Sequence, residues 1–174
     1  MSTTTEEGDT PNPNPLRKKK IVIVRENQFL EEDETVEDPI DSLEIYETLK
    51  GINDPEYPFS LEELGIISPE QIQVDSKRRW IKVEYTPTVP NCKLSTLIGL
   101  SVRTKLYRSF PSYKYDVVIE KGKHDTEEEI NKQVNDKERC FAALEQRGLK
   151  RAIDKCLATS LSLTKKEIKK LTKF

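Results

Sequence analysis

The stretch WIKVEYTPTVPNCKLSTLIGLSVRTKLYRSFPSYKYDVVIEKG, Trp80 to Gly122, contains a strand pattern, a helix pattern and a second strand pattern in succession. Side chains alternate from Trp80 to Thr86, so one face of this predicted strand can be buried. Apolar residues then recur at three- and four-residue spacings, which predicts a helix over about 93–108, and residues 113–122 form the next strand. A strand-helix-strand unit of this length favours parallel pairing with a right-handed crossover.

The residues before this unit predict a further strand and a short helix. QIQVD, around Ile72 and Val74, is separated from the Trp80 strand by the polar turn SKRR, so a β-hairpin is expected. SLEIYETLKGI has apolar residues at helical spacing, with Asp41 or Ser42 as the N-cap. Ser60 is predicted to cap a single turn that follows.

The residues after this unit predict two helices. Thr126 and Glu129 match the capping-box pattern at the start of a helix. The apolar residues assigned to that helix are Ile130, Val134, Phe141 and Leu144. A shorter helix follows Gly148 and uses Leu149, Ile153 and Leu157. We therefore predict an α+β fold of the two-layer α/β type, with a small mixed sheet on which the helices pack.

Length and composition indicate one domain with polar tails. The chain has 174 residues, of which 34% are hydrophobic and 34% are charged, so it has room for one modest core. We expect a disordered arm with basic and acidic runs over residues 1–40, the domain over 41–158, and a lysine-rich tail over 159–174. Its apolar stretches are far shorter than the roughly 20 residues that span a bilayer, and the acidic start is unlike a signal peptide. A soluble intracellular protein without membrane contact is expected.

Three cysteines carry most of the candidate chemistry. Cys92, Cys140 and Cys156 form no CxxC pair, which favours reduced thiols over a disulfide framework or a zinc site. Cys92 follows the stiff segment TPTVPN, and with Asn91 as N-cap it would lie in the first turn of the helix, where the helix dipole favours a thiolate. The alternative is an ordinary helix-start residue. The other two cysteines are expected to be buried structural thiols.

Histidine and carboxylate side chains give weaker signals. His124, the single histidine, is a metal ligand or proton carrier on one interpretation and a hydrogen-bonded structural residue on the other. Four carboxylates near the first helix either supply a site or partner contact, or cap and solubilise the chain: Asp54, Glu56, Glu62 and Glu63. There is no phosphate-binding Gly-rich loop, GxSxG or HExxH. Because an iron-sulfur cluster normally takes four thiolates, any cluster would be shared with another chain.

Three stretches resemble a known family: INDPEYPFSLEELGI, YTPTVPNCKLSTLIGLSVRTKL and VNDKERCFAALEQ. They are similar to the cytosolic iron-sulfur cluster assembly component 2 family, whose domain is shared with the bacterial SufT and PaaD proteins, and the match runs from about Asp41 to Leu157. NPNPL, Asn12 to Leu16, resembles the b-type branch. The family's reactive cysteine corresponds to Cys92. Its GTH segment corresponds to GKH, which ends at His124 and has lysine in place of threonine.

The resemblance implies a subunit of the complex that hands iron-sulfur clusters to cytosolic and nuclear apoproteins. Its partners would be a WD40 propeller subunit, a HEAT-repeat adaptor and the client apoproteins. Our leading hypothesis is therefore a non-enzymatic adaptor with Cys92 as a transient cluster ligand. It would hold no stably bound cofactor, only a transient shared iron-sulfur cluster. A cytoplasmic location is expected, while a nuclear pool and a homodimer are left open.

Two hypotheses from other classes remain open. The first is a nucleic-acid-binding module that uses the lysine-rich tail and interleaved basic and aromatic residues. These residues are Arg103, Lys105, Tyr107, Arg108, Tyr113, Lys114 and Tyr115. The second is a thiol-dependent enzyme in which His124 acts as the base for Cys92.

Overall fold

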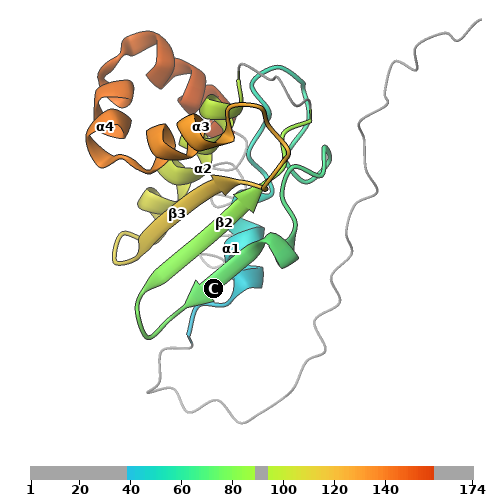
Figure 1. Cartoon of the computed structure of the whole chain (residues 1–174), viewed down its shortest axis with the longest axis vertical. Helices are drawn as coiled ribbons and strands as arrows, with labels where there is room; N and C mark the ends of the chain where they lie inside the picture. The colour runs from blue at the N-terminus through green and yellow to red at the C-terminus, as the bar shows by residue number, and fades with distance from the viewer. Residues whose placement is uncertain (1–38, 89–93, 159–174) are drawn as a thin grey trace, which may run out of the picture.

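A three-stranded sheet with the order β1-β2-β3 forms the centre of the fold (Figure 1). The computed structural model describes residues 39–88 and 94–158. β1 (Ile72–Asp75) pairs antiparallel with β2 (Trp80–Tyr85), and β2 pairs parallel with β3 (Lys114–Ile119). The predicted hairpin, parallel pair and mixed sheet are therefore confirmed.

Helices cover one face and one edge of this sheet. The described residues contain α1 (Ser42–Leu49), the 3-10 helix η1 (Pro69–Gln71), α2 (Ser95–Ser109), α3 (Glu127–Asn135), α4 (Lys137–Glu145) and a further helix over residues 147–158. In Figure 1, α1 and α2 lie behind the sheet, so the β2-α2-β3 connection is right-handed as predicted. The Asp41 carboxylate accepts a hydrogen bond from Glu44 N at 2.6 Å, which confirms the predicted N-cap of α1.

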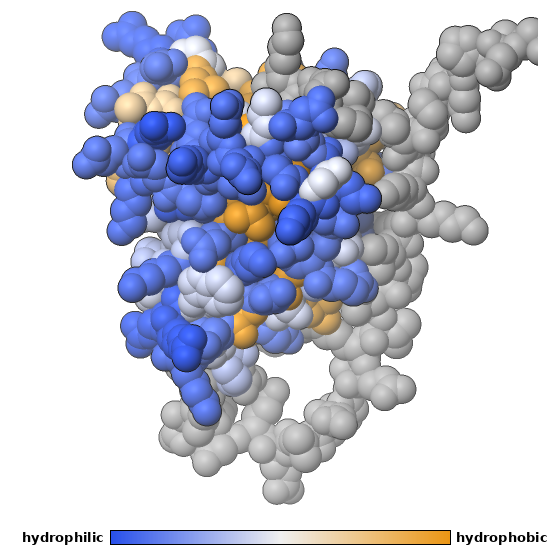
Figure 2. Space-filling view, in the orientation of Figure 1, coloured by the Kyte–Doolittle hydropathy of each residue, from blue (hydrophilic) through white to orange (hydrophobic). Residues whose placement is uncertain are grey.

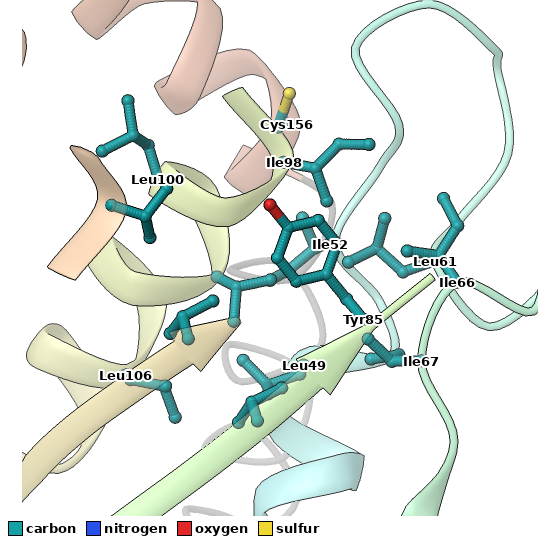
Figure 3. Packing of buried hydrophobic residues seen from close by; sticks show 14 of the residues in the cluster. Leu49, Ile52, Leu61, Ile66, Ile67, Tyr85, Ile98, Leu100, Leu106 and Cys156 are labelled. Atoms are coloured by element: carbon teal, nitrogen blue, oxygen red, sulfur yellow. The ribbon is translucent and has the colours of Figure 1, made fainter. Parts of the chain in front are cut away.

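The hydrophobic core lies between the sheet and the helices behind it. One face of β2 is buried, as its alternation predicts: Ile81, Val83 and Tyr85 are all fully buried. Figure 3 shows the Tyr85 ring among apolar side chains, with its hydroxyl directed toward α2. The opposite sheet face is polar: Trp80 Nε1 donates to Asp116 Oδ2 at 2.8 Å, and Figure 2 shows a mostly hydrophilic surface there. The two-layer prediction is confirmed.

Side chains from two helices complete the outer edge of β3. Val117 N donates to Asn135 Oδ1 and Asn135 Nδ2 donates to Val117 O, both at 2.9 Å. Ile119 N donates to Asn131 Oδ1 at 2.8 Å, and Arg103 Nη1 donates to Tyr115 O at 3.2 Å. The three β3 residues in these bonds, Tyr115, Val117 and Ile119, are every second residue of the strand. In a parallel pair, every second residue directs its backbone N–H and C=O groups to the same side, which here is the side away from β2. Side chains of the helices thus hydrogen-bond to backbone groups of β3 that would otherwise be free to pair with another strand.

The predicted long helix after Thr126 is wrong, because the chain forms α3 and α4 instead. Asp136 between them is extended, with φ −75° and ψ 118°, and its carboxylate accepts from Glu138 N at 2.9 Å. Asp136 therefore acts as the N-cap of α4, a role that interrupts the helix. The break also turns Phe141 outward, and this predicted core residue is 55% exposed.

Several predictions concern residues beyond the described ranges. The disordered arm falls almost entirely on residues 1–38 and the lysine-rich tail on 159–174, so both lie outside the described residues. Among the helices of the described ranges, none combines the length and apolar composition that crossing a bilayer requires.

Candidate functional site

The predicted reactive residues follow two neighbouring strands at the same edge of the sheet. Tyr85 at the end of β2 pairs with Ile119 at the end of β3. Cys92 lies in the connection after β2, and His124 lies in the loop after β3. The carboxyl ends of adjacent parallel strands are a common place for ligand sites. Cys92 itself lies in residues 89–93, outside the described residues, so its contacts and its reactivity stay predictions.

The chain that leads toward Cys92 is anchored by a polar cluster at this edge. Thr86 N donates to Ile66 O at 2.8 Å, and the Thr86 hydroxyl donates to a Glu120 carboxylate oxygen. Gln71 Nε2 donates to Thr86 Oγ1 at 2.9 Å, and Glu120 N donates to Tyr85 O at 2.9 Å. Pro87, the next residue, is buried. The defined path predicted from the prolines is therefore present as far as Pro87.

On the far side of the 89–93 connection, α2 is packed tightly against β2. The Tyr85 hydroxyl donates to Ser95 O at 3.0 Å. A Cβ atom at Gly99 would lie 2.8 Å from that hydroxyl and 2.9 Å from a Val134 methyl, so this glycine permits the close approach of α2 to its neighbours. α2 begins at Ser95 with Leu94 at the N-cap, so the predicted cap at Asn91 is wrong. The hydrogen bond from Tyr85 to Ser95 O holds the first turn of α2 in place. A search for local capping residues in the sequence cannot detect such a tertiary contact.

His124 is held by hydrogen bonds in its own loop. Its Nδ1 accepts from Thr126 N at 3.1 Å, which leaves the proton of a neutral ring on Nε2. Thr126 makes no side-chain cap for α3, so the predicted capping box is not formed. Instead, Glu127 Oε2 accepts from Gly122 N at 2.7 Å and closes the loop that carries the histidine. The structural interpretation of His124 is supported, and a role toward Cys92 stays a prediction.

Three of the four candidate carboxylates stabilise local structure. Asp54 is buried and its Oδ1 accepts from Glu56 N at 2.8 Å and Tyr57 N at 2.9 Å. Glu63 accepts from Ser60 N at 3.0 Å and completes the predicted single turn. The Tyr46 hydroxyl donates to Glu62 Oε1 at 3.4 Å, and burial, followed by this carboxylate, raises the pKa of Tyr46. Glu56 is the exposed member of the set.

The other two thiols are buried, as predicted. Cys140 is 8% exposed and its thiol donates to Val134 O at 2.9 Å, while Cys156 is 3% exposed in the core (Figure 3). Burial raises the pKa of both thiols, because it disfavours the charged thiolate. No group of three or more His, Cys, Asp or Glu residues within 39–88 and 94–158 is arranged to hold a metal ion.

We expect alkylation of the folded protein by iodoacetamide to leave Cys140 and Cys156 largely unmodified. Their raised pKa values and their burial both reduce the concentration of accessible thiolate at mildly alkaline pH. Peptide mass spectrometry would compare their labelling with that of Cys92, and guanidinium-unfolded protein gives the matched control with all three thiols labelled. Rapid labelling of either buried cysteine in the folded protein would contradict the assignment.

The structure divides the predicted basic and aromatic surface into two parts. Arg103, Lys114 and the three tyrosines line one cavity beside α2, β3 and α4. Lys105 is not in its lining and is only 5% exposed, and burial, followed by the charge of Arg108, lowers the pKa of Lys105. Arg108 pairs with Asp154 at 3.1 Å. Five of the seven residues therefore lie together in one lining, and nucleic-acid binding by this set stays a prediction.

Several known proteins are similar in sequence to most of this chain. A MIP18 family protein of Caenorhabditis elegans is 51% identical over 130 residues, which cover 73% of this chain and 81% of the relative. Protein AE7 of Arabidopsis thaliana is 47% identical over 126 residues, 72% of this chain and 80% of the relative. Cytosolic iron-sulfur assembly component 2B of Mus musculus is 47% identical over 129 residues, 74% of this chain and 79% of the relative.

No protein-family model matches the chain. The identities above nevertheless extend over about three quarters of the sequence, and they confirm the resemblance that the three quoted stretches indicated. The chain belongs to the family of the MIP18 proteins and cytosolic iron-sulfur assembly component 2B.

Proposed function

We propose that this chain is a non-enzymatic adaptor in cytosolic iron-sulfur protein assembly. The observation that carries the proposal is the 47% identity with the mouse protein named cytosolic iron-sulfur assembly component 2B, over 74% of this chain. In this role the chain would bring the assembly machinery to cytosolic and nuclear apoproteins that receive iron-sulfur clusters. The cluster is cargo in this scheme. The name of this relative supports a cytoplasmic location for the chain, and a nuclear pool would serve nuclear clients.

In the proposed mechanism Cys92 contacts the cargo transiently. A thiolate is the side chain that iron-sulfur clusters prefer as a ligand, and a cluster normally takes four of them. The buried positions of Cys140 and Cys156 keep those thiols from an external cluster. The chain would therefore contribute one ligand, with the remaining ligands supplied by another chain. The polar cluster at Thr86 supports this role, because it fixes the end of β2 from which the Cys92 connection departs.

The proposed partners are a WD40 propeller subunit and a HEAT-repeat adaptor. Of the four candidate partner-contact residues, Glu56 is exposed and available to another chain. Asp54, Glu62 and Glu63 already accept the hydrogen bonds described above. A partner that contacts these carboxylates would therefore have to leave those hydrogen bonds in place. A shared cluster between two copies would also be consistent with a homodimer.

The adaptor role is tested by affinity purification of the tagged full-length chain from cells that lack its homologue. We expect a WD40 protein and a HEAT-repeat protein to co-purify, and the activity of a cytosolic iron-sulfur enzyme to recover. Glu56→Lys, a charge reversal at an exposed position, is expected to weaken co-purification selectively, with Glu128→Lys on the exposed face of α3 as the matched control. If neither protein co-purifies and the client enzyme stays inactive, the adaptor role is wrong.

A further inference from the structure

An aromatic groove lies at the end of the sheet opposite the Cys92 connection. It has a volume of about 470 Å³ and lies between α2, the start of β3 and α4. Tyr107 and Phe141 form part of its wall and contact each other edge to face, with ring centroids 6.5 Å apart. They are 57% and 55% exposed, although large apolar side chains elsewhere in the described ranges are mostly covered. Exposed apolar surface gathered around a cavity is typical of a binding site.

The lining of the aromatic groove carries positive charge. It includes Arg103, Lys114 and Lys137, and no acidic residue is among the described residues that line it. Arg103 is held in place, because its Nη1 donates to Tyr115 O at 3.2 Å and to Asn135 Oδ1 at 3.0 Å. Lys114 and Lys137 are exposed. The groove therefore fits a segment that joins apolar side chains to carboxylates.

The N-terminal part of the chain enters the domain at the same end of the sheet. Ile40 O accepts a hydrogen bond from the hydroxyl of Ser76, which follows β1. Across the sheet from Ser76, Lys114 N donates to Arg79 O at 2.8 Å. Two strand spacings of about 5 Å separate β1 from β3, so the entry point lies on the order of 10 Å from Lys114. Residues 29–38, which precede this point, can span roughly 30 Å when extended.

We propose that residues 29–34, FLEEDE, dock in the aromatic groove of the same chain. Phe29 and Leu30 would cover the exposed rings of Tyr107 and Phe141. The carboxylates that follow, beginning with Glu31, would then face the exposed lysines of the rim. Attachment to the domain favours this occupant over a free acidic peptide, since a short tether gives an effective concentration in the millimolar range.

Carbodiimide crosslinking of the full-length chain tests the proposal, because it joins carboxylates to nearby lysine amines. We expect peptides containing Glu31 to Glu34 to be coupled to Lys114 and Lys137. Lys77 is the matched control: it is exposed and adjoins Ser76 at the entry point, yet it does not line the groove. Its yield should be lower, although it is nearer to the point where the segment enters.

Two variants separate docking from chance proximity. The double variant Phe29→Ala, Leu30→Ala should reduce the Lys114 and Lys137 crosslinks by about tenfold, because it removes the apolar surface that would be buried. Phe141→Ala should reduce them as well, and the high exposure of this side chain predicts little effect on folding. Mixing isotope-labelled and unlabelled chains identifies crosslinks between copies.

Three results would overturn the proposal. A Lys77 yield equal to or above that of the groove lysines would show undirected contact. Unchanged crosslinks in the double variant would exclude the apolar anchor. Crosslinks that join labelled to unlabelled chains would assign the groove to a second copy. The proposal does not depend on the adaptor role, so either can fail without the other.

Discussion

Asn135→Ala is expected to lower the free energy of unfolding by about 3 kcal/mol, because one side chain satisfies several partly buried groups at once. Asn135 makes four hydrogen bonds, to Val117 N, Val117 O, Asn131 O and Arg103 Nη1. Alanine would leave both backbone groups of Val117 without these partners on the outer edge of β3. Each buried polar group that loses its partner costs roughly 1–3 kcal/mol. Urea unfolding followed by circular dichroism measures the change.

Matched variants on α3 show whether the hydrogen bonds cause the loss. Gln133→Ala removes an exposed amide from the same helix and should change the free energy of unfolding by less than about 0.5 kcal/mol. Asn131→Ala removes one bond, to Ile119 N, and should cost about 1 kcal/mol. Asn135→Asp keeps an acceptor for Val117 N but loses the donor to Val117 O, so it should fall between Asn131→Ala and Asn135→Ala. Equal effects of Gln133→Ala and Asn135→Ala would contradict the edge-satisfaction argument.

The alternation of Trp80 to Tyr85 predicts β2 and the burial of one of its faces. Successive side chains of a strand point to opposite faces, so a set of apolar residues at every second position indicates a buried face. The length of the connection to β3 then predicted a parallel pair. Both inferences need only information local to the sequence. The three quoted stretches, one of which contains Cys92, indicate the family for a similar reason: the residues of each motif are consecutive in the chain.

The features that sequence reasoning missed depend on contacts between distant residues. Asn135 and Asp136 were placed inside one helix, although Asn135 binds β3 and Asp136 caps α4. The dipeptide Asn-Asp within an apolar pattern was the available signal, since both residues favour caps and turns. The aromatic groove was missed for a related reason: Phe141 matches a helical apolar stripe, and only the break at Asp136 turns it toward Tyr107.

Cys92→Ala is expected to abolish most maturation of a cytosolic iron-sulfur enzyme in cells that depend on this chain, under the function proposed above. Alanine cannot bind iron or sulfur, and neither Cys140 nor Cys156 can take over, because both are buried and have raised pKa values. Cys92→Ser should fail almost as completely, because a serine hydroxyl lacks the soft thiolate character that cluster ligation uses. The activity of the client enzyme, normalised to the amount of its polypeptide, measures the effect.

Cys140→Ala is the matched control, because it removes a cysteine but keeps Cys92, the proposed cluster ligand. It removes the thiol that donates to Val134 O, so a stability loss of about 1 kcal/mol is expected while client maturation continues. Co-purification of the partner proteins with Cys92→Ala then separates the two parts of the proposed function. Intact co-purification with lost maturation assigns the thiol to cluster handling and the rest of the chain to bridging. Normal maturation by Cys92→Ala would remove the thiol from the mechanism and leave the adaptor role standing, because bridging depends on surfaces and not on the sulfur atom.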